Sequence, residues 1–309
     1  MIVYESNKNW LKDVRHLYRS WTMQRVMRSS LSIAGFTAVI CFVDMQFFHF
    51  IGDGLDTGIF SLLGIVLSIL LAFRTTTAYD RWWEGRKKWG QLVNDSRNLA
   101  IYIQSTAPSE DSETRRFFAT RISNFSIALK EHLRQGVKVD EMVYLTEEEK
   151  ETYKSKGHIP SYIALEMIQK IQDMYKAGAI SPEDHLNIKL HSQEFMNICG
   201  ACERIKKTPI PFSYNVYLKV FISLYAALLP FALLPMFGYW TILMVGFVFF
   251  AFIGIELMAE EVEDPFGLDC NDLPTGNIAH TIKNNVFEIL EQKSSIGKEH
   301  LTKLYDKVF

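Results

Sequence analysis

The feature that most constrains the fold is a run without any charged residue, from Val220 to Ile255. As one α-helix, these 36 residues would be about 54 Å long, whereas the hydrocarbon core of a bilayer is only about 30 Å thick. Pro230, Pro235 and Gly238 interrupt the run, and both residue types tend to end helices. The run therefore predicts a hairpin of two membrane spans, over about residues 216–236 and 239–257.

Two further apolar runs lie in the first quarter of the chain. One covers about residues 29–51, with Asp44 as its only Asp, Glu, Lys or Arg, and the other covers about 57–73. Lys and Arg are concentrated before the first run and after the second, whereas the connection at 52–56 is acidic. Because basic flanks stay in the cytoplasm, we predict a multi-pass protein of the plasma (inner) membrane with both termini cytoplasmic. Asp44 has either a functional role inside the bilayer or an interfacial one near the outer end of its span.

The remaining sequence, about residues 74–212 and 258–309, has the periodicity of soluble helices. Apolar residues recur among charged ones at helical spacing, and no stretch alternates as a β-strand would. Ser181, Pro182 and Glu183 have the residue types of an N-cap and a first helical turn. We therefore predict an all-α membrane protein in which four transmembrane helices are interleaved with a cytosolic helical block. Together they form a single domain over residues 1–309.

Composition and motifs exclude several classes of function. The net charge of −2 provides no basic surplus for nucleic acid, and no nucleophile elbow, P-loop or dinucleotide fingerprint occurs. We therefore expect neither nucleic-acid binding nor an enzyme. Cys199 and Cys202 form a C-x-x-C pair without a second ligand pair, which favours helix packing over a zinc or redox role. His185 and His191 are six residues apart, which is not the spacing of a helical ligand pair.

The span at 57–73 carries a stripe of large apolar residues. Ile65, Ile69 and Phe73 recur at i, i+4 and i+8, so they share one face of the helix. Small residues lie between them, which allows neighbouring helices to approach closely. Stripes of this kind are usually lipid-facing or part of a bundle core, so the spacing alone does not assign a function.

The stretch that follows the stripe is more specific. From Phe73 to Gly90 the chain reads F-R-x-x-x-x-Y-D-R-W-W-E-G-R-x-x-W-G. This pattern resembles the signature of the bestrophins, a family of pentameric ion channels. The segment Ile210–Tyr214 and the acidic segment 256–272 are also similar to bestrophin segments, so the resemblance covers nearly the whole chain. It implies a bestrophin-like fold and a homopentamer around a central pore in the lipid bilayer.

The resemblance also implies roles for particular residues. The neck positions of the family, counted back from Arg81, fall on Ile65, Ile69 and Phe73, the residues that the stripe selects independently. They would form a hydrophobic neck that gates passive permeation by dewetting. The aromatic and charged cluster would anchor the neck helix to the cytosolic block, with its charged members ion-paired, or its tryptophans mark only the membrane interface. Its members are Tyr79, Asp80, Arg81, Trp82, Trp83 and Glu84.

The acidic segment 256–272 contains seven carboxylates and no base. Calcium takes about six to eight oxygen ligands, but the spacing is not that of an EF-hand, which favours a solvated acidic face over a cation site. The segment resembles the bestrophin clasp, which binds calcium in animal members of the family. The resemblance makes calcium the one cofactor to consider, although bacterial relatives need not be gated by it. The implied ligands are Glu261, Asp264 (in place of the usual Asn), Asp269 and Asp272.

The sequence constrains the permeant ion least. A second constriction of the family, at the cytosolic exit, falls on Glu183, with Ile180 as a near alternative that would make the exit apolar. A ring of Glu183 carboxylates would favour cations, and Asp53 and Asp56 would enrich cations at the outer mouth. Alternatively, Glu183 serves only the start of its helix. We expect permeation of monovalent ions with a cation preference; the alternatives are a chloride- or anion-selective bestrophin channel and a membrane receptor or enzyme.

Overall fold

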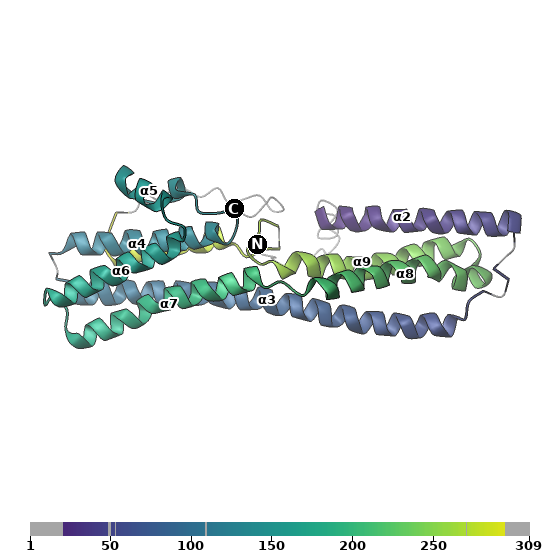
Figure 1. Ribbon diagram of the computed structural model, residues 1–309, viewed down its shortest axis with the longest axis horizontal. Helices are drawn as coiled ribbons and strands as arrows, with labels where there is room; N and C mark the ends of the chain where they lie inside the picture. The colour runs from purple at the N-terminus through teal and green to yellow at the C-terminus, as the bar shows by residue number, and fades with distance from the viewer. Residues whose placement is uncertain (1–20, 49–50, 53, 109, 270, 294–309) are drawn as a thin grey trace, which may run out of the picture. The chain divides into compact units, whose positions relative to one another are not determined.

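The computed structural model describes residues 21–48, 51–52, 54–108, 110–269 and 271–293. Within these ranges the chain is helical and contains no strand, as predicted (Figure 1). It divides into two compact units. The apolar-helix unit consists, in the described part of the chain, of residues 21–82 and 209–264. The polar-helix unit consists of residues 83–208 and the segment from Pro265 onward.

The apolar-helix unit contains the four predicted spans. Each of its helices includes a window long and apolar enough to cross a membrane. Helix α2 continues without a break into a π-helical turn, and only the first part of α3 belongs to this unit. The helices are α2 (Trp21–Val43) with η1 (Asp44–Phe48), α3 (Thr57–Thr106), α8 (Phe212–Phe237) and α9 (Trp240–Glu263).

Several helix ends differ from the predicted span boundaries. Helix α2 begins at Trp21, before the expected residue 29, and α3 continues past Phe73 to Thr106. Helix α8 begins at Phe212, before the expected residue 216, and α9 ends at Glu263, beyond the expected residue 257. Hydropathy marks where the bilayer ends, but backbone hydrogen bonds continue into water as long as no residue interrupts them. No proline occurs between Thr57 and Thr106, so α3 remains one helix of 50 residues.

The α8–α9 hairpin turns at Gly238. This residue has φ +52°, a left-handed conformation that favours glycine, and its N–H donates to the Leu234 carbonyl at 2.9 Å. Pro230 and Pro235 both remain inside α8. The apolar run is therefore divided near Gly238 as predicted, but Pro230 does not divide it.

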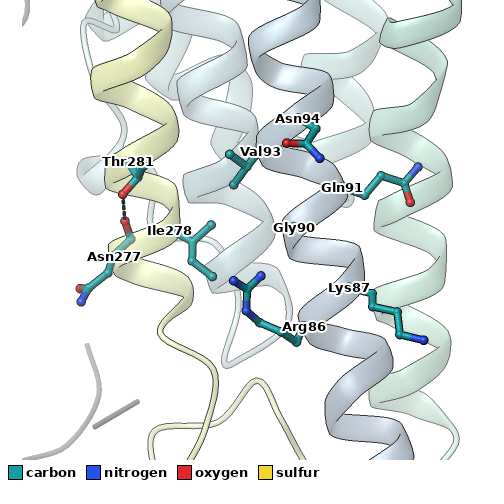
Figure 2. Close-up of a pocket in the computed structure, with 9 residues that line it drawn as sticks. All are labelled: Arg86, Lys87, Gly90, Gln91, Val93, Asn94, Asn277, Ile278 and Thr281. Carbon is teal, nitrogen blue, oxygen red and sulfur yellow. Dashed lines mark hydrogen bonds between the residues drawn. The ribbon is translucent and has the colours of Figure 1, made fainter. Parts of the chain in front are cut away.

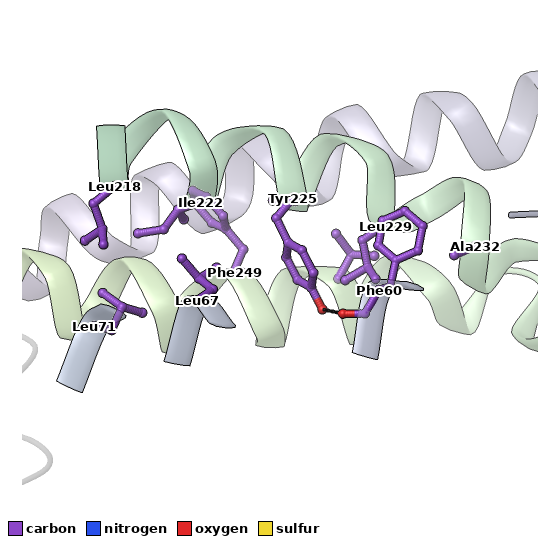
Figure 3. Close-up of a cluster of buried hydrophobic side chains, with 11 residues drawn as sticks. Phe60, Leu67, Leu71, Leu218, Ile222, Tyr225, Leu229, Ala232 and Phe249 are labelled. Atoms are coloured by element: carbon purple, nitrogen blue, oxygen red, sulfur yellow. Dashed lines mark hydrogen bonds between the residues drawn. The ribbon is translucent and has the colours of Figure 1, made fainter. Parts of the chain in front are cut away.

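A buried apolar cluster holds α3, α8 and α9 together (Figure 3). Leu67 and Leu71 of α3 are at most 1% exposed within it. Tyr225 of α8 donates its hydroxyl to the Phe60 carbonyl at 3.2 Å. One face of α3 is thereby fixed against α8 and α9. The other labelled members are Leu218, Ile222, Leu229, Ala232 and Phe249.

Short-range caps define the helices of the polar-helix unit. Asp111 accepts the N–H of Thr114 and caps α4, which begins at Ser112. Ser181 accepts the N–H of Asp184 and caps α7 as predicted. Besides the rest of α3, the elements are α4 (Ser112–His132), η2 (Val139–Glu141), α5 (Glu147–Lys154), α6 (Ile159–Lys176), α7 (Pro182–Lys207) and α10 (Thr275–Ile289).

Candidate functional site

The predicted neck stripe lies on the face of α3 opposite its packed face. Ile65, Ile69 and Phe73 are 58%, 51% and 66% exposed, whereas Leu67 and Leu71 are buried in the cluster of Figure 3. At about 100° per residue, the stripe and the buried pair point in opposite directions. The stripe is thus an apolar surface of the single chain, open to lipid, to a pore or to another chain.

The exposed face of α3 extends beyond the predicted stripe in both directions. Leu62 precedes Ile69 by seven residues and is 67% exposed, and Asp80 follows Phe73 by seven residues and is also exposed. Seven residues make about two helical turns, so all of these residues share one face. The face is therefore apolar along most of its length and ends in a carboxylate.

Arg74, directly after Phe73, lies in a buried ion-pair network with the end of α9. Its side chain is 1% exposed, and its Nη2 donates to Glu263 Oε2 at 2.7 Å. Its Nε lies 3.6 Å from Oε2 of Glu256, whose side chain has no exposed surface. Because buried charges are stable only when paired, this network fixes the C-terminal end of the stripe against α9.

Glu263 connects three segments of the apolar-helix unit. Its Oε2 binds Arg74, and its Oε1 accepts the N–H of Ile210, just before α8, at 2.7 Å. Its carbonyl accepts a hydrogen bond from Arg81 Nε at 3.1 Å. The last turn of α9 is therefore tied to α3 at two points and to the entrance of α8.

The acidic segment is not a solvated face where it forms the end of α9. Glu256 and Glu263 are buried, so that expectation is wrong for both of them. The physical reason is Arg74, whose guanidinium compensates their charge away from water. In the sequence, Arg74 is only one member of the basic flank that follows the span at 57–73, and nothing local links it to Glu256 or Glu263.

The remaining carboxylates of the end of α9 also have protein partners. Glu260 forms ion pairs with Lys219 of α8 at 2.8 Å and with Arg25 of α2 at 3.6 Å. Glu261 accepts a hydrogen bond from the Thr22 hydroxyl. The acidic end of α9 therefore binds the basic and polar ends of α2, α3 and α8.

The aromatic and charged cluster contributes to both units. In the apolar-helix unit, Tyr79 and Trp82 stack with their ring centroids 6.1 Å apart. In the polar-helix unit, Trp83 is 45% exposed and Glu84 pairs with Arg204 at 2.7 Å. The ion pair of Glu84 is thus made with α7, and the anchoring role of the cluster remains a prediction.

Gly85 allows a close approach within the polar-helix unit. A Cβ atom at this position would lie 3.1 Å from the ring of Phe266 and 3.2 Å from Pro265. Phe266 is itself buried, and it belongs to the segment that resembles the clasp. The motif around Gly85 and the clasp segment, far apart in sequence, are therefore in contact.

Comparison with known proteins identifies the family. The sequence profile described as "Bacterial/Fungal Bestrophin protein" matches residues 1–288. The chain belongs to the bestrophin family. A crystal structure of a bacterial bestrophin homologue from Klebsiella pneumoniae is similar, with a TM-score of 0.80 and 30% sequence identity. That similarity covers 86% of this chain and 98% of the Klebsiella chain.

Curated relatives of this bestrophin are named as channel-forming proteins. A voltage-dependent anion channel-forming protein of Nostoc sp. (strain PCC 7120) is 36% identical over 243 residues, or 77% of this chain and 78% of its own. The voltage-dependent anion channel-forming protein YneE of Escherichia coli (strain K12) is 28% identical over 292 residues, or 94% and 95%. The bestrophin fold and the four membrane-capable helices identify a membrane protein.

The four residues predicted for the clasp are divided between the units. Glu261 and Asp264 belong to the apolar-helix unit, and Asp269 and Asp272 to the polar-helix unit. Asp272 is buried, and its Oδ2 accepts the N–H of Asp269 at 2.7 Å. This part of the clasp is therefore a turn closed by its own carboxylate.

A guanidinium group lies close to that turn. Arg134 of α4 donates from Nε to the Phe266 carbonyl at 3.3 Å and from Nη2 to the Thr275 hydroxyl at 3.1 Å. Burial lowers the pKa of Arg134, and the carboxylates of Glu131 and Asp272 act in the opposite direction. Calcium needs about six to eight oxygen ligands and no cation beside it. The polar-helix part of the clasp therefore does not by itself fit calcium.

The two candidates for the cytosolic exit differ in exposure. Ile180 is 6% exposed and packs inside the polar-helix unit. Glu183 is exposed in the first turn of α7, where Ser181 and Asp184 form the cap. Of the two side chains, only that of Glu183 is available to a pore or to solvent.

A basic pocket of about 680 Å³ lies between α3 and α10 of the polar-helix unit (Figure 2). Arg86 and Lys87 from α3 provide its positive charge, and Asn94, Asn277 and Thr281 add polar groups. Thr281 donates its hydroxyl to the Asn277 carbonyl at 2.9 Å. The two sides of this pocket come from segments far apart in the sequence, residues 86–94 and 277–281, so no local pattern predicts it.

The cysteines and histidines of the polar-helix unit lie in several separate surroundings. Cys199 and Cys202 are free and buried, and burial raises the pKa of each thiol to about 12, so the packing role is confirmed. His191 lies 3.1 Å from Asp95, and His185 stacks on Tyr175, so the two histidines have separate surroundings. A cluster of His132, His158 and Glu203 was missed, because these residues come from three different helices.

Proposed function

We propose that this bestrophin is an ion channel, formed by five copies of the chain around a central pore. The observation that carries the proposal is the exposed apolar face of α3 opposite its packed face. In a homopentamer, five such faces would meet on the axis and form a pore. The two units would act together as one channel domain over residues 1–309.

The neck of this pore would be formed by Ile65, Ile69 and Phe73. Rings of these side chains offer no ligand to an ion, so permeation would depend on whether the neck is wet. The buried pair of Arg74 and Glu263 would hold the helix in place directly next to the neck. The cluster from Tyr79 to Glu84 would anchor the neck helix to the cytosolic block.

The orientation proposed for the chain places the basic flanks of α2 and α3 in the cytoplasm. Arg25 and Arg28 lie on α2, and Arg81 and Arg86 lie on α3 beyond the apolar stretch. Positive residues near the ends of spans favour the cytoplasmic side. We accordingly infer a plasma (inner) membrane protein with cytoplasmic termini.

The proposed channel prefers monovalent cations. Glu183 supports this preference because its exposed carboxylate is free to form a ring at the cytosolic exit, where Ile180 is buried. Asp80 supports it independently, because it is exposed on the same face of α3 as the neck stripe. Rings of carboxylates favour cations over anions.

Anion permeation is the second candidate. The names of the curated relatives, which describe voltage-dependent anion channel-forming proteins, favour it. Purified protein in planar bilayers, under a tenfold gradient of sodium chloride, tests both candidates. A cation-selective channel reverses near the sodium equilibrium potential, about 59 mV from zero, and an anion-selective channel reverses at the opposite sign. An absence of current from correctly assembled pentamers would reject the channel itself.

A further inference from the structure

Three side chains of metal-ligating type meet in the polar-helix unit, outside the proposed pore. His132 lies in the last turn of α4, His158 is the N-cap of α6, and Glu203 lies on α7. The Nε2 atoms of His132 and His158 are 2.5 Å and 3.0 Å from the same oxygen, Oε1 of Glu203. Among the described residues, these three form the one group whose ligand atoms all lie within 4.8 Å of one another.

The cluster is held firmly but can be reached from solvent. The side chains of His132, His158 and Glu203 are 20%, 35% and 22% exposed. The two imidazole rings are 4.5 Å apart and inclined at 51°, so their Nε2 atoms converge on one point. An ion could therefore enter without the three helices having to separate.

We propose that His132, His158 and Glu203 bind a divalent transition metal ion, with Zn²⁺ as the best match and water completing the coordination. Zinc is bound by imidazole nitrogen and carboxylate oxygen at about 2.0–2.2 Å, usually by four ligands. Calcium and magnesium select sites made of oxygen atoms, so two imidazole ligands disfavour both ions. The ion would replace two hydrogen bonds with three metal–ligand bonds.

The surroundings of His158 support this exchange. Its Nδ1 accepts the N–H of Ser161 at 3.1 Å and lies 2.8 Å from the Ser161 hydroxyl oxygen. When a metal occupies Nε2, the proton of the neutral ring resides on Nδ1, which can no longer accept the N–H. It can donate to the Ser161 hydroxyl instead, in the way that metal-ligating histidines are normally oriented. Ser161 is therefore a hydrogen-bond partner of His158 both without and with the metal ion.

The charge of Glu203 also suits a cation. Its Oε1 lies within hydrogen-bond distance of both imidazole Nε2 atoms, so the carboxylate already points to the place where a cation would bind. Lys207 lies 3.7 Å from its Oε1, but the lysine side chain is 72% exposed and can move away into solvent.

The test is zinc binding by the purified, tag-free channel after treatment with chelator. Calorimetry should detect one high-affinity zinc ion per chain, and zinc should raise the melting temperature whereas calcium should not. His132→Gln and Glu203→Gln should abolish this site, and Ser161→Ala should weaken zinc binding about 10- to 100-fold. His158 is left unchanged because it also caps α6.

His185→Gln is the matched control, since His185 belongs to the same unit but stacks on Tyr175 away from the cluster. This variant should bind zinc like the wild type. Co²⁺ provides a second readout, because a four-coordinate site gives strong visible absorption that His132→Gln should remove. The proposal is overturned if the wild type binds no zinc, or if correctly assembled His132→Gln and Glu203→Gln channels bind it unchanged. Either result would leave the cluster as a hydrogen-bonded helix junction.

Discussion

Arg74 and Glu263 form a charged hydrogen bond of 2.7 Å in the interior of the apolar-helix unit. Arg74 follows Phe73 directly, and Glu263 ends α9, where it also accepts the N–H of Ile210. The pair therefore links the exposed stripe of α3 to the start of α8. Removal of either partner should therefore destabilise the whole apolar-helix unit.

Arg74→Ala should destabilise the channel strongly. The substitution leaves Glu263 and Glu256 buried without their cation, and breaking a buried pair in this way typically costs about 3–5 kcal/mol. Thermal unfolding of the detergent-solubilised protein measures the effect. A loss of stability within error of zero would contradict the role assigned to this network.

Arg204→Ala provides the matched control for that substitution. The pair of Arg204 and Glu84 has the same length of 2.7 Å, but its side chains are 67% and 42% exposed. Exposed pairs contribute only about 0–1 kcal/mol because water screens them. The two substitutions should therefore differ clearly although both remove an arginine from a carboxylate.

Calcium should leave the stability of the protein unchanged. Oδ2 of Asp272 already accepts the Asp269 N–H, and the Arg134 guanidinium lies beside the same turn. Binding of calcium to the native state alone, at 100 times its dissociation constant, would stabilise by about 2.7 kcal/mol, which a thermal shift assay detects easily. A shift of that size with calcium, reversed by chelator, would show that the clasp is a calcium site after all.

The four spans could be predicted from the sequence, but the partners of their charged ends could not. The membrane-capable helices and the turn at Gly238 follow from local composition. Hydropathy and the length of each uncharged run were therefore sufficient to predict them. The pairing of Arg74 with Glu263 joins residues that are 189 positions apart. Only the packing of α3 on α9 brings them together, and no periodicity in either segment reports it.

Acid should weaken the ion pair between Arg121 of α4 and Glu149 of α5. Burial acts to raise the pKa of Glu149, but Arg121 and the Thr146 N–H outweigh it, so the pKa lies below its ordinary value of 4.5. The ionised form is thus the stabilising one. Its contribution is complete above pH 4.5 and is lost as pH falls through the lowered pKa of the folded state.

Glu149→Gln should therefore reduce the loss of stability between pH 5 and pH 3. Glu147→Gln is its control, because Glu147 pairs with Lys150 on the surface, where screening leaves little effect. Melting temperatures across this range give the comparison. Equal pH dependence in wild type and Glu149→Gln would show that the Arg121 pair does not control acid stability.

Glu183→Gln should reduce the preference for cations. The substitution removes an exposed carboxylate from the proposed exit without a large change in shape. Asp184→Asn is the control, since Asp184 accepts the Ser181 hydroxyl at 2.7 Å and belongs to the helix cap. Reversal potentials should shift toward zero for Glu183→Gln and not for Asp184→Asn. A cation current that Glu183→Gln leaves unaltered would keep the selectivity but assign it elsewhere, with Asp80 as the next residue to change.

The neck stripe was only partly readable from the sequence. Its spacing placed Ile65, Ile69 and Phe73 on one face of a helix, and the structure adds that this face is opposite the packed one. Exposure alone does not distinguish a pore from lipid, because Val220, Leu224 and Leu228 of α8 have the same i, i+4, i+8 spacing and are 48%, 57% and 48% exposed. This second stripe is a control that the molecule itself provides.

The most direct measurement of the central claim compares these two stripes in planar bilayers. Each triple alanine variant removes three exposed apolar side chains at identical spacing, so effects on folding and on lipid contact should be similar. If α3 lines the pore, alanine at Ile65, Ile69 and Phe73 should widen and wet the neck and raise the conductance, whereas alanine at Val220, Leu224 and Leu228 should leave it unchanged. Unchanged conductance in the α3 variant, or an equal increase in both variants, would contradict the assignment of this face to the pore.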